Sequence, residues 1–323
     1  MTLLEIENLT IKLRKHGVEA TLVESLSYEV EAGETLAIVG ESGSGKSLSS
    51  LAVMGLLAED LHITSGSIRF DGVDLLGLSS EDMRKRRGRD ISMVFQEPMT
   101  SLNPVRTIGS QITESIEENV GLSGAHARAR AIALLQEVGV SDAEQRMRQY
   151  PHHFSGGMRQ RVMIAIALAA EPRLIIADEP TTALDVTIQA QILDLMARIC
   201  REHGTALILI THNLGVVARY ARRVNVMYGG RIVESGLART LYYAPRHPYT
   251  QGLLRSVPRL DRPRSEPLEP IAGNPADPFA RITGCRFHPR CPHAQAVCTT
   301  TVPAFDGQVA CHFPLSDETR EAS

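Results

Sequence analysis

The sequence predicts an α/β fold with a mainly parallel sheet, because short apolar strands alternate with helical patterns along much of the chain. Buried-strand patterns occur at residues 35–39, 91–95, 174–177 and 206–210. Helical patterns occur at residues 47–57, 158–170 and 186–203. Alternation of this kind is typical of a parallel sheet with helices on both faces.

Further strands and helices are expected around this core. Strand patterns occur at residues 3–13, 26–30 and 67–70. Residues 107–149 have a helical pattern, and Ser141 and Glu144 have the spacing of a capping box that would start one of the helices. We therefore expect a helical subdomain inserted at about residues 98–158.

The composition changes after Tyr243. Residues 244–280 are rich in proline, and residues 259–264 predict a charged linker. The last part of the chain carries most of its cysteines. These shifts divide the chain into a first domain at residues 1–243 and an extension at residues 244–323.

The overall composition is that of an ordinary globular protein. The 323 residues are 43% hydrophobic and 22% charged, with a net charge of −3 that gives no general attraction to nucleic acid. No apolar run approaches the roughly 20 residues that span a bilayer. The first residues lack the basic and apolar segments of a signal peptide. We expect a cytoplasmic protein that reaches a membrane only through partner subunits.

A glycine-rich loop joins the strand at residues 35–39 to its helix. Its eight residues are Gly40, Glu41, Ser42, Gly43, Ser44, Gly45, Lys46 and Ser47. Gly43 and Gly45 let backbone N–H groups turn toward phosphate oxygens, and the helix adds its positive N-terminal end. Lys46 supplies a charge for the β- and γ-phosphates of a nucleotide, and the Ser47 hydroxyl ligates Mg²⁺. The strand–loop–helix order favours a phosphate site over a chance glycine-rich loop.

Polar side chains follow three of the predicted strands. They are Gln96, the pair Asp178 and Glu179, and His212. Asp178 is placed to hold Mg²⁺, and Glu179 is the natural general base for an attacking water. We expect the Gln96 amide to contact both Mg²⁺ and that water, and His212 to contact the γ-phosphate. An acidic pair after a strand is as often a solvated loop as a catalytic site, and the phosphate loop upstream favours the catalytic role here. A lone histidine is more often structural, but the spacing of His212 after the acidic pair favours a catalytic one. A lone glutamine is usually a surface residue, so the role of Gln96 depends on a family resemblance.

A second glycine motif starts the helix at residues 158–170. Ser155, Gly156 and Gly157 would place backbone N–H groups at a helix N-terminus, which is an anion site. Because the chain already has one phosphate site, this motif predicts contact with a nucleotide held by another subunit, in a head-to-tail dimer. The simpler alternative is a capped helix.

These motifs together resemble those of ATP-binding cassette (ABC) ATPases over about residues 3–243. Leu184 and Asp185 look like the loop that couples the two active sites of such a dimer. The resemblance implies a P-loop ABC nucleotide-binding domain with an antiparallel β subdomain and an inserted helical subdomain. The segments most similar to the oligopeptide/dipeptide permease branch are residues 95–104, 154–161, 177–185, 247–250 and 284–292.

The resemblance implies an ATPase subunit that powers import of di- or oligopeptides. Its partners would be a paralogous ABC ATPase, two transmembrane permease subunits and an extracytoplasmic solute-binding protein, at the cytoplasmic face of the inner membrane. Residues just after Gln96 would dock a permease's coupling helix. Importers of nickel, metallophores, glutathione and some sugars share the branch, so the solute stays open.

Two positions depart from the wider cassette pattern. Met158 stands where most cassettes have glutamine, as in the peptide-permease branch. Residues 14–18 lack the aromatic ring that the family often stacks on adenine. This leaves His16 and Val18 as weak candidates for that contact.

Four of the five cysteines lie in the C-terminal tail. They are Cys285, Cys291, Cys298 and Cys311. In a reducing cytoplasm, clustered cysteines indicate a metal centre before disulfides. Four thiolates suit a [4Fe–4S] cluster, which the peptide-permease branch can carry, although the spacing is not that of a ferredoxin. The close cysteine pair of most zinc sites is absent, but His288, His293 and His312 keep zinc as the alternative.

Two other function classes compete with a transport ATPase. A soluble cassette acting on DNA or ribosomes would carry a second cassette or a long coiled-coil insertion, and the sequence has neither. The net charge also gives no nucleic-acid footprint, so we expect no nucleic-acid partner. A redox-sensing tail is compatible with the cysteines, but no residue pattern favours it.

Overall fold

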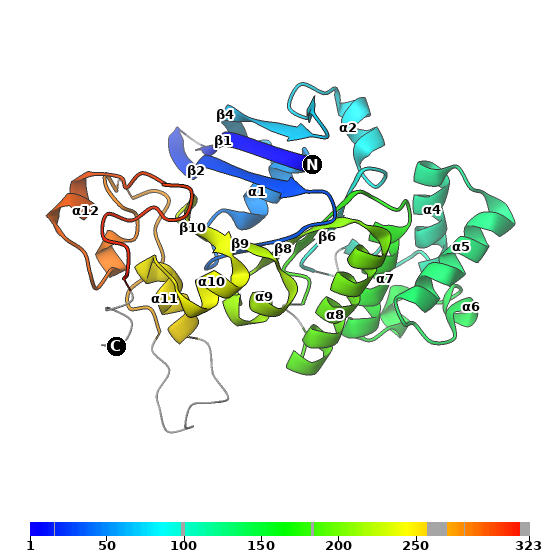
Figure 1. Cartoon of the computed structure of the whole chain (residues 1–323). Coiled ribbons are helices and arrows are strands. Elements are labelled where there is room, and N and C mark those ends of the chain that lie inside the picture. The colour runs from blue at the N-terminus through cyan, green and yellow to red at the C-terminus, as the bar shows by residue number, and fades with distance from the viewer. Residues whose placement is uncertain (16, 98–100, 182–183, 257–269, 281, 317–323) are drawn as a thin grey trace. The chain divides into compact units, whose positions relative to one another are not determined.

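The computed structural model describes two compact units. The described residues are all except 16, 98–100, 182–183, 257–269, 281 and 317–323 (Figure 1). Unit 1 consists of residues 1–2, 30–35 and 77–210, and unit 2 of residues 3–29, 36–76 and 211–323. The linker predicted at residues 259–264 and the adenine candidate His16 lie outside the described residues.

Unit 1 contains three parallel strands in the order β8-β7-β6. They are β6 (Ile91–Val94), β7 (Leu174–Asp178) and β8 (Ala206–Thr211), whose last residue belongs to unit 2. Every residue of β7 and β8 is buried. Continuous burial is typical of parallel strands covered on both faces, and it explains why their sequences are apolar runs without alternation. The predicted parallel sheet is confirmed by these pairings.

The helices of unit 1 fall within or close to the predicted ranges, except α2 at Ser80–Arg86, which the sequence analysis did not predict. They are α2 (Ser80–Arg86), α4 (Ile108–Val120), α5 (Gly124–Glu137), α6 (Ala143–Arg146), α7 (Gly156–Leu168) and α8 (Val186–His203), with a 3₁₀ turn at Pro151–His153. The capping box predicted at Ser141 and Glu144 is wrong. Asp142 takes the cap position of α6 in a left-handed conformation, with φ of 52°, and makes no side-chain cap bond.

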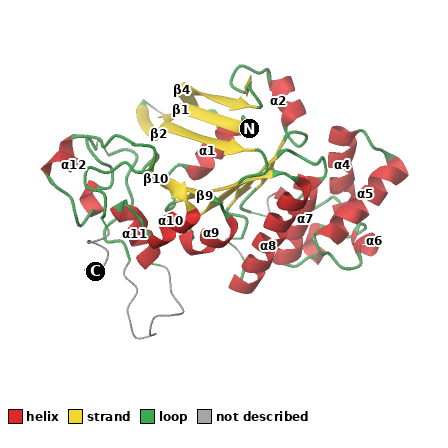
Figure 2. Ribbon diagram, in the orientation of Figure 1, coloured by secondary structure: helices red, strands yellow, loops and turns green. Residues whose placement is uncertain are grey.

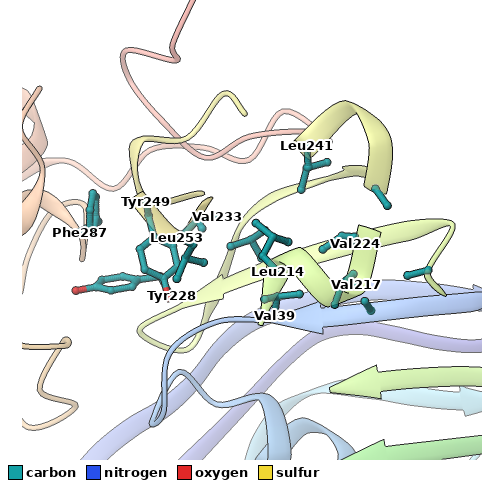
Figure 3. Packing of buried hydrophobic residues seen from close by; sticks show 14 residues of the cluster. Val39, Leu214, Val217, Val224, Tyr228, Val233, Leu241, Tyr249, Leu253 and Phe287 are labelled. Carbon is teal, nitrogen blue, oxygen red and sulfur yellow. The ribbon is translucent and has the colours of Figure 1, made fainter. Parts of the chain in front are cut away.

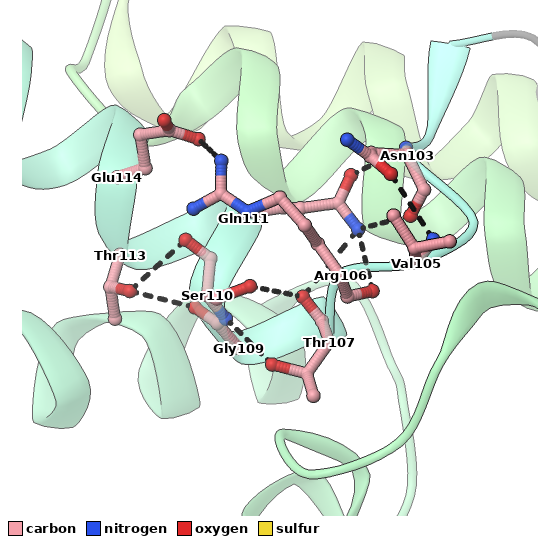
Figure 4. Close-up of polar contacts among 9 residues, drawn as sticks. All are labelled: Asn103, Val105, Arg106, Thr107, Gly109, Ser110, Gln111, Thr113 and Glu114. Atoms are coloured by element: carbon pink, nitrogen blue, oxygen red, sulfur yellow. Dashed lines mark hydrogen bonds and ion pairs between the residues drawn. The ribbon is translucent and has the colours of Figure 1, made fainter.

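Polar contacts fix the start of α4 (Figure 4). The Thr107 hydroxyl caps the helix by accepting from the Ser110 N–H at 3.2 Å. The Gln111 amide accepts from the Asn103 N–H at 2.8 Å and donates to the Arg106 carbonyl at 3.2 Å. One side chain therefore ties the helix to the loop before it. The first part of the segment predicted to dock a permease, residues 98–100, lies outside the described residues.

Unit 2 contains a four-stranded sheet in the order β2-β1-β4-β5 and three further strands in the order β10-β9-β3. The strands are β1 (Thr2–Lys15), β2 (Val18–Glu31), β3 (Thr35–Val39), β4 (Leu61–Phe70), β5 (Val73–Asp74), β9 (Arg223–Tyr228) and β10 (Arg231–Leu237). β4 runs antiparallel to both β1 and β5, which confirms the expected antiparallel subdomain. β3 pairs with β9 in parallel, and β9 with β10 antiparallel.

The helices of unit 2 are short (Figure 2). They are α1 (Lys46–Val53), α9 (Leu214–Tyr220), α10 (Ala238–Tyr243), α11 (Pro248–Arg255) and α12 (Ala296–Thr300), with a 3₁₀ turn at His288–Arg290. The tail joins β10, since the Ala310 N–H donates to the Val233 carbonyl at 2.8 Å and the Ser235 N–H donates to the Gln308 carbonyl at 2.7 Å. Within the described residues, no helix combines the length and the apolar character needed to cross a membrane.

One apolar cluster packs the C-terminal extension onto the strands of unit 2 (Figure 3). Val39 of β3 and Leu253 of α11 belong to it. The Tyr228 ring lies 4.6 Å from the fully buried Tyr249 ring and 5.1 Å, edge to face, from the Phe287 ring. Burial of an aromatic side chain stabilises a fold by about 1.5–3 kcal/mol. The extension therefore shares a core with the strand that leads into the glycine-rich loop.

Candidate active site

The glycine-rich loop, residues 40–47, connects β3 to α1 as the sequence predicts. Gly40 must lack a side chain, because a Cβ there would lie 2.2 Å from the Met227 carbonyl oxygen of β9. Gly43 and Gly45 have φ of 78° and 99°, in the region that favours glycine. The loop thus turns tightly against β9 and enters α1 at Gly45.

Lys46 is buried inside this loop, with 4% of its surface exposed. Its ammonium donates to the carbonyl of Gly40 at 2.7 Å, to the carbonyl of Glu41 at 2.9 Å and to the hydroxyl of Ser44 at 3.4 Å. Three neutral acceptors therefore engage the three donors of the side chain. A phosphate would offer charged acceptors in their place, and those make stronger hydrogen bonds.

The C-terminal extension holds the loop at Glu41. Arg290, 5% exposed at its side chain, donates to the two carboxylate oxygens of Glu41 at 2.6 and 3.1 Å. The same guanidinium lies 5.8 Å from the centre of the Tyr228 ring. The Tyr249 hydroxyl accepts from the Glu41 backbone N–H at 2.8 Å. Hydrogen bonds to Glu41 raise the pKa of the Arg290 guanidinium.

The turn between β9 and β10 holds the other side of the loop. The Gly230 N–H donates to the Ser44 carbonyl at 3.0 Å. A Cβ on Gly230 would lie 2.3 Å from the Leu22 carbonyl of β2, so the turn also approaches β2 closely. The neighbouring Gly229 carbonyl accepts from Arg286, whose guanidinium also pairs with Glu24. No sequence pattern predicts these supports. Tyr249, Arg286 and Arg290 lie in residues 247–250 and 284–292, whose sequence indicates only a similarity to the oligopeptide/dipeptide permease branch.

A second group of predicted residues lies in unit 1. The parallel pairing of β6 with β7 aligns Val94 with Ala177, so both strands end at the same edge. Asp178 ends β7 and is 7% exposed. Gln96, just beyond β6, donates from Nε2 to Oε2 of Glu179 at 3.3 Å. The structure therefore brings Gln96 and Glu179 together.

The backbone at Glu179 has an unusual conformation, with φ of 44°. Its N–H donates to the Ile210 carbonyl of β8 at 3.0 Å, which ties this turn to the sheet. A left-handed conformation is uncommon for a residue with a side chain and often marks functional positions. No local sequence pattern predicts this conformation. His212, with an exposed side chain, follows β8 directly in unit 2.

Ser155 is the N-cap of α7. Its hydroxyl accepts from the Met158 N–H at 3.4 Å, which is the capping role of the simpler alternative. Ser155 and Gly156 are nevertheless exposed, so this helix end is accessible to solvent. A Cβ on Gly157 would lie 2.9 Å from the Ile188 side chain, so glycine lets α7 approach α8 closely.

Asp185 caps α8. Its carboxylate accepts from the N–H groups of Thr187 at 3.1 Å and Ile188 at 3.0 Å. The side chain is exposed, and its capping role was not predicted. Because Ile188 also contacts the position of Gly157, the two predicted motifs of unit 1 lie side by side.

The four tail cysteines lie near one another. Burial, together with a smaller contribution from the neighbouring thiols of Cys285, Cys291 and Cys298, raises the pKa of the Cys311 thiol to about 11. Among the described residues, however, no three His, Cys, Asp or Glu side chains are grouped as a metal ion requires. The donor set suits a metal centre, but the structure does not assemble one. Beyond the closeness of the four thiols, the described residues give the predicted [4Fe–4S] cluster and the zinc alternative no support.

Two family profiles match the sequence. The ABC transporter profile matches residues 23–182, and the profile of the oligopeptide/dipeptide transporter C-terminal region matches residues 233–298. The oligopeptide transport ATP-binding protein AppD of Bacillus subtilis is 51% identical, over 94% of this chain and 92% of its own length. The dipeptide transport ATP-binding protein DppD of Escherichia coli is 46% identical over 99% of both chains. OppD of Salmonella typhimurium, an oligopeptide transport ATP-binding protein, is 50% identical over 98% of this chain and 95% of its own.

Solved structures agree with the observed fold. The ATP-binding cassette MJ0796, in a dimeric post-hydrolysis state bound to ADP and Pi, superposes with a TM-score of 0.66 at 27% identity. The match covers 73% of this chain and 99% of that one. A second dimeric structure of MJ0796, a bacterial ABC transporter cassette, gives a TM-score of 0.65 over the same shares of the two chains. The strands and helices described above are thus those of an ATP-hydrolysing cassette.

Proposed function

Because this chain belongs to the ABC transporter family, in its oligopeptide/dipeptide branch, we propose that it hydrolyses ATP to power the import of di- and oligopeptides. The observation that carries the proposal is the 46–51% identity to oligopeptide and dipeptide transport ATP-binding proteins over at least 94% of the chain. Import of nickel, a metallophore, glutathione or a sugar by the same mechanism is the alternative.

The site residues have the following proposed roles. Residues 40–47 bind the phosphates of ATP, with Lys46 directed to the β- and γ-phosphates. Ser47, Asp178 and Gln96 hold Mg²⁺, which neutralises charge on the transferred phosphoryl group when bound. Glu179 accepts a proton from the attacking water, and His212 contacts the γ-phosphate. The contact between Gln96 and Glu179 supports their shared role in orienting that water.

ATP hydrolysis is proposed to occur in a head-to-tail dimer with a paralogous ABC ATPase. Ser155, Gly156, Gly157 and Asp185 would then contact the nucleotide bound by the partner's phosphate loop. The exposure of the α7 N-terminus supports this role, as do the dimeric structures of the related cassette. An ATP shared between two subunits binds the closed dimer more tightly than the open one, which lets ATP drive closure.

The remaining partners follow from the importer proposal. Two permease subunits would carry the solute path, and residues just after Gln96 would dock a cytoplasmic coupling helix. An extracytoplasmic solute-binding protein would select the solute. The chain would then sit at the cytoplasmic face of the inner membrane, held through the permease subunits. No nucleic-acid partner is proposed, and co-purification with membrane subunits tests this against a soluble cassette acting on DNA or ribosomes.

We assign residues 1–243 to the ATPase domain and residues 244–323 to the extension. For the tail we propose a [4Fe–4S] cluster, supported by the donor set of four neighbouring thiols and by nothing else in the structure. Zinc is the alternative. Iron and acid-labile sulfide measured in anaerobically purified protein decide between them, and the absence of both would refute the cluster.

One experiment tests both the solute and the role of Glu179 in hydrolysis. It measures uptake of labelled di- and oligopeptides into cells and, in parallel, uptake of nickel ion. Glu179→Gln should abolish peptide uptake, because the attacking water loses its base. Glu202→Gln, an exposed glutamate of α8, is the matched control and should leave uptake intact. Loss of nickel uptake alone would keep the mechanism and change the solute. Full peptide uptake by Glu179→Gln would contradict the proposal.

A further inference from the structure

The phosphate loop accounts for the phosphates of ATP but not for its base. In unit 2 a cavity of about 350 Å³ opens beside the loop, at Gly43. This volume is within the range of about 300–1,000 Å³ typical of small-molecule sites. A Cβ on Gly43 would meet no atom within 4 Å, so the loop is open on this side. The cavity is therefore directly accessible from a phosphate held by the loop.

Two parts of the chain far apart in sequence form the cavity. Ala20 and Leu22 of β2 line one side, and Ala276 and Phe279 of the C-terminal extension line another. Phe279 is 55% exposed, the largest exposed fraction among the described phenylalanines. A large ring with an accessible face, next to small apolar side chains, is suited to a flat aromatic ligand.

The extension holds Phe279 in this place through local contacts. The Asp277 carboxylate accepts from the Phe279 N–H at 2.9 Å, and the Ala280 N–H donates to the Asp277 carbonyl at 3.1 Å, which closes a turn. Ala276 is anchored at the β9–β10 turn, because a Cβ on Gly229 would lie 3.3 Å from its Cβ. The next residue of that turn, Gly230, donates to the phosphate loop at Ser44. The wall and the loop are thus braced by the same turn.

We propose that this cavity receives the nucleoside of ATP, and that Phe279 stacks on its base. The C-terminal extension would then form one wall of the nucleotide site and would be part of ATP recognition. The inference rests on the proposed function, since it takes ATP to be bound by residues 40–47. It also explains how the chain can bind a purine although residues 14–18 contain no aromatic ring.

The chain offers a direct spectroscopic test because it contains no tryptophan. In the full-length protein, Phe279→Trp places a single tryptophan at the proposed stacking position, and its emission can be excited apart from that of the tyrosines. Saturating ADP should change its emission strongly, whereas saturating pyrophosphate, which has no base, should change it little. Phe313→Trp, an exposed tail position that does not line this cavity, is the matched control and should respond to neither ligand.

Binding affinities separate stacking from support of the loop. Phe279→Ala should raise the Kd for ADP about tenfold, the size expected for loss of one stacked ring, and leave the Kd for pyrophosphate unchanged. Phe279→Tyr keeps the ring and should restore ADP affinity. An equal loss for ADP and pyrophosphate, or no loss for either, would overturn the proposal. If the wild-type chain bound ADP no better than Lys46→Ala, the proposed function itself would fail.

Discussion

The chain has two glycine-rich helix starts that are built in opposite ways. The phosphate loop at residues 40–47 is closed inside unit 2, with Ser44 and Lys46 buried. The start of α7 at residues 155–157 is in unit 1 and has Ser155 and Gly156 exposed. Both present backbone N–H groups at a helix N-terminus, which suits an anion. Only the first is surrounded by its own chain.

The difference lies in the number of supports. Arg290, Tyr249 and Gly230 hold the phosphate loop through hydrogen bonds to Glu41 and Ser44. At Ser155 the described hydrogen bonds are local to α7: its hydroxyl accepts from the Met158 N–H and its carbonyl accepts from the Arg159 N–H. A braced loop is preorganised for its ligand, while an exposed helix start needs another surface to complete it. One helix start is therefore built as a site in itself, whereas the other is suited to completion by a second surface.

The largest expected effect is on the rate of ATP hydrolysis, after substitution of Glu179. In the assembled importer, Glu179→Gln should lower the ATP hydrolysis rate by about 10²–10⁴-fold, because a general base contributes about that much. ATP binding should be unchanged, since the phosphate loop is intact. Steady-state hydrolysis and equilibrium binding on the same preparation measure the two effects. A variant that hydrolyses ATP at the wild-type rate would remove Glu179 from its proposed role.

The next effect concerns the phosphate loop. Lys46→Ala should raise the Kd for ATP about 100-fold, because charged hydrogen bonds to the phosphates are lost. Isothermal titration of the isolated chain measures this Kd. Lys85→Ala, an exposed lysine paired with Glu81 on α2, is the matched control and should bind ATP normally. Normal ATP binding by Lys46→Ala would contradict the proposal that residues 40–47 form the phosphate site.

Acid should also destabilise the C-terminal extension that holds the phosphate loop, because this extension contains the fully buried His247. Burial lowers the pKa of His247 to about 3, so it stays neutral in the folded chain while the unfolded chain takes up a proton below about pH 6.5. Stability therefore falls as the pH drops from 6.5 toward 3. Between pH 7 and pH 5 this group should cost about 2 kcal/mol of unfolding free energy, measured by urea denaturation.

A variant isolates the contribution of His247 to this pH dependence. The His247 ring accepts from the Tyr249 N–H at 3.1 Å at the start of α11, and asparagine can keep such a cap. His247→Asn should lose the extra pH dependence, and the exposed His62→Asn should keep it. The buried Glu234, whose pKa is raised by burial, acts in the opposite direction but is present in every variant. The same slope in His247→Asn and wild type would refute the assignment.

A smaller effect on ATP binding is expected from the ion pair between Arg290 and Glu41. Arg290→Ala should raise the Kd for ATP about tenfold, which corresponds to about 1.4 kcal/mol, because Glu41 loses its partner and the loop its preorganisation. Arg290→Lys should fall between this variant and wild type, since lysine cannot make the paired hydrogen bonds of a guanidinium. Titration calorimetry resolves both changes. If Arg290→Ala bound ATP as wild type does, the ion pair between Arg290 and Glu41 would have no role in ATP binding.

The sequence predicted what local patterns determine. The strand–loop–helix order beginning at residue 35 and the bounds of α8 at Val186–His203 follow from apolar periodicity and are found as expected, although α1 ends at Val53 and not at the predicted residue 57. β2 starts at Val18, well before the predicted residue 26, because its outer part pairs through the backbone while Val18 and Glu19 stay exposed. Pairing of this kind leaves little trace in the side-chain pattern.

The supports of the site could not be predicted, because they join distant segments. Arg290 and Glu41 are 249 residues apart in the chain, and Tyr249 and Glu41 are 208 apart. Nothing in the local sequence of Arg290 marks it as a partner of the phosphate loop. The left-handed conformation of Glu179 is equally hidden, since it results from the tie to β8. The local sequence therefore predicted the phosphate loop, but it did not predict the distant residues that hold the loop in place.

Ser155→Arg tests most directly whether the phosphate loop and the start of α7 have different roles, because it blocks the exposed start of α7 with a large side chain. ATP binding by the isolated chain and ATP hydrolysis by the assembled importer are measured together, with Ser123→Arg at the exposed start of α5 as the matched control. We predict wild-type ATP binding and lost hydrolysis for Ser155→Arg, because only the partner's nucleotide needs Ser155. Loss of ATP binding by the isolated Ser155→Arg chain would contradict the division into one complete site and one half site.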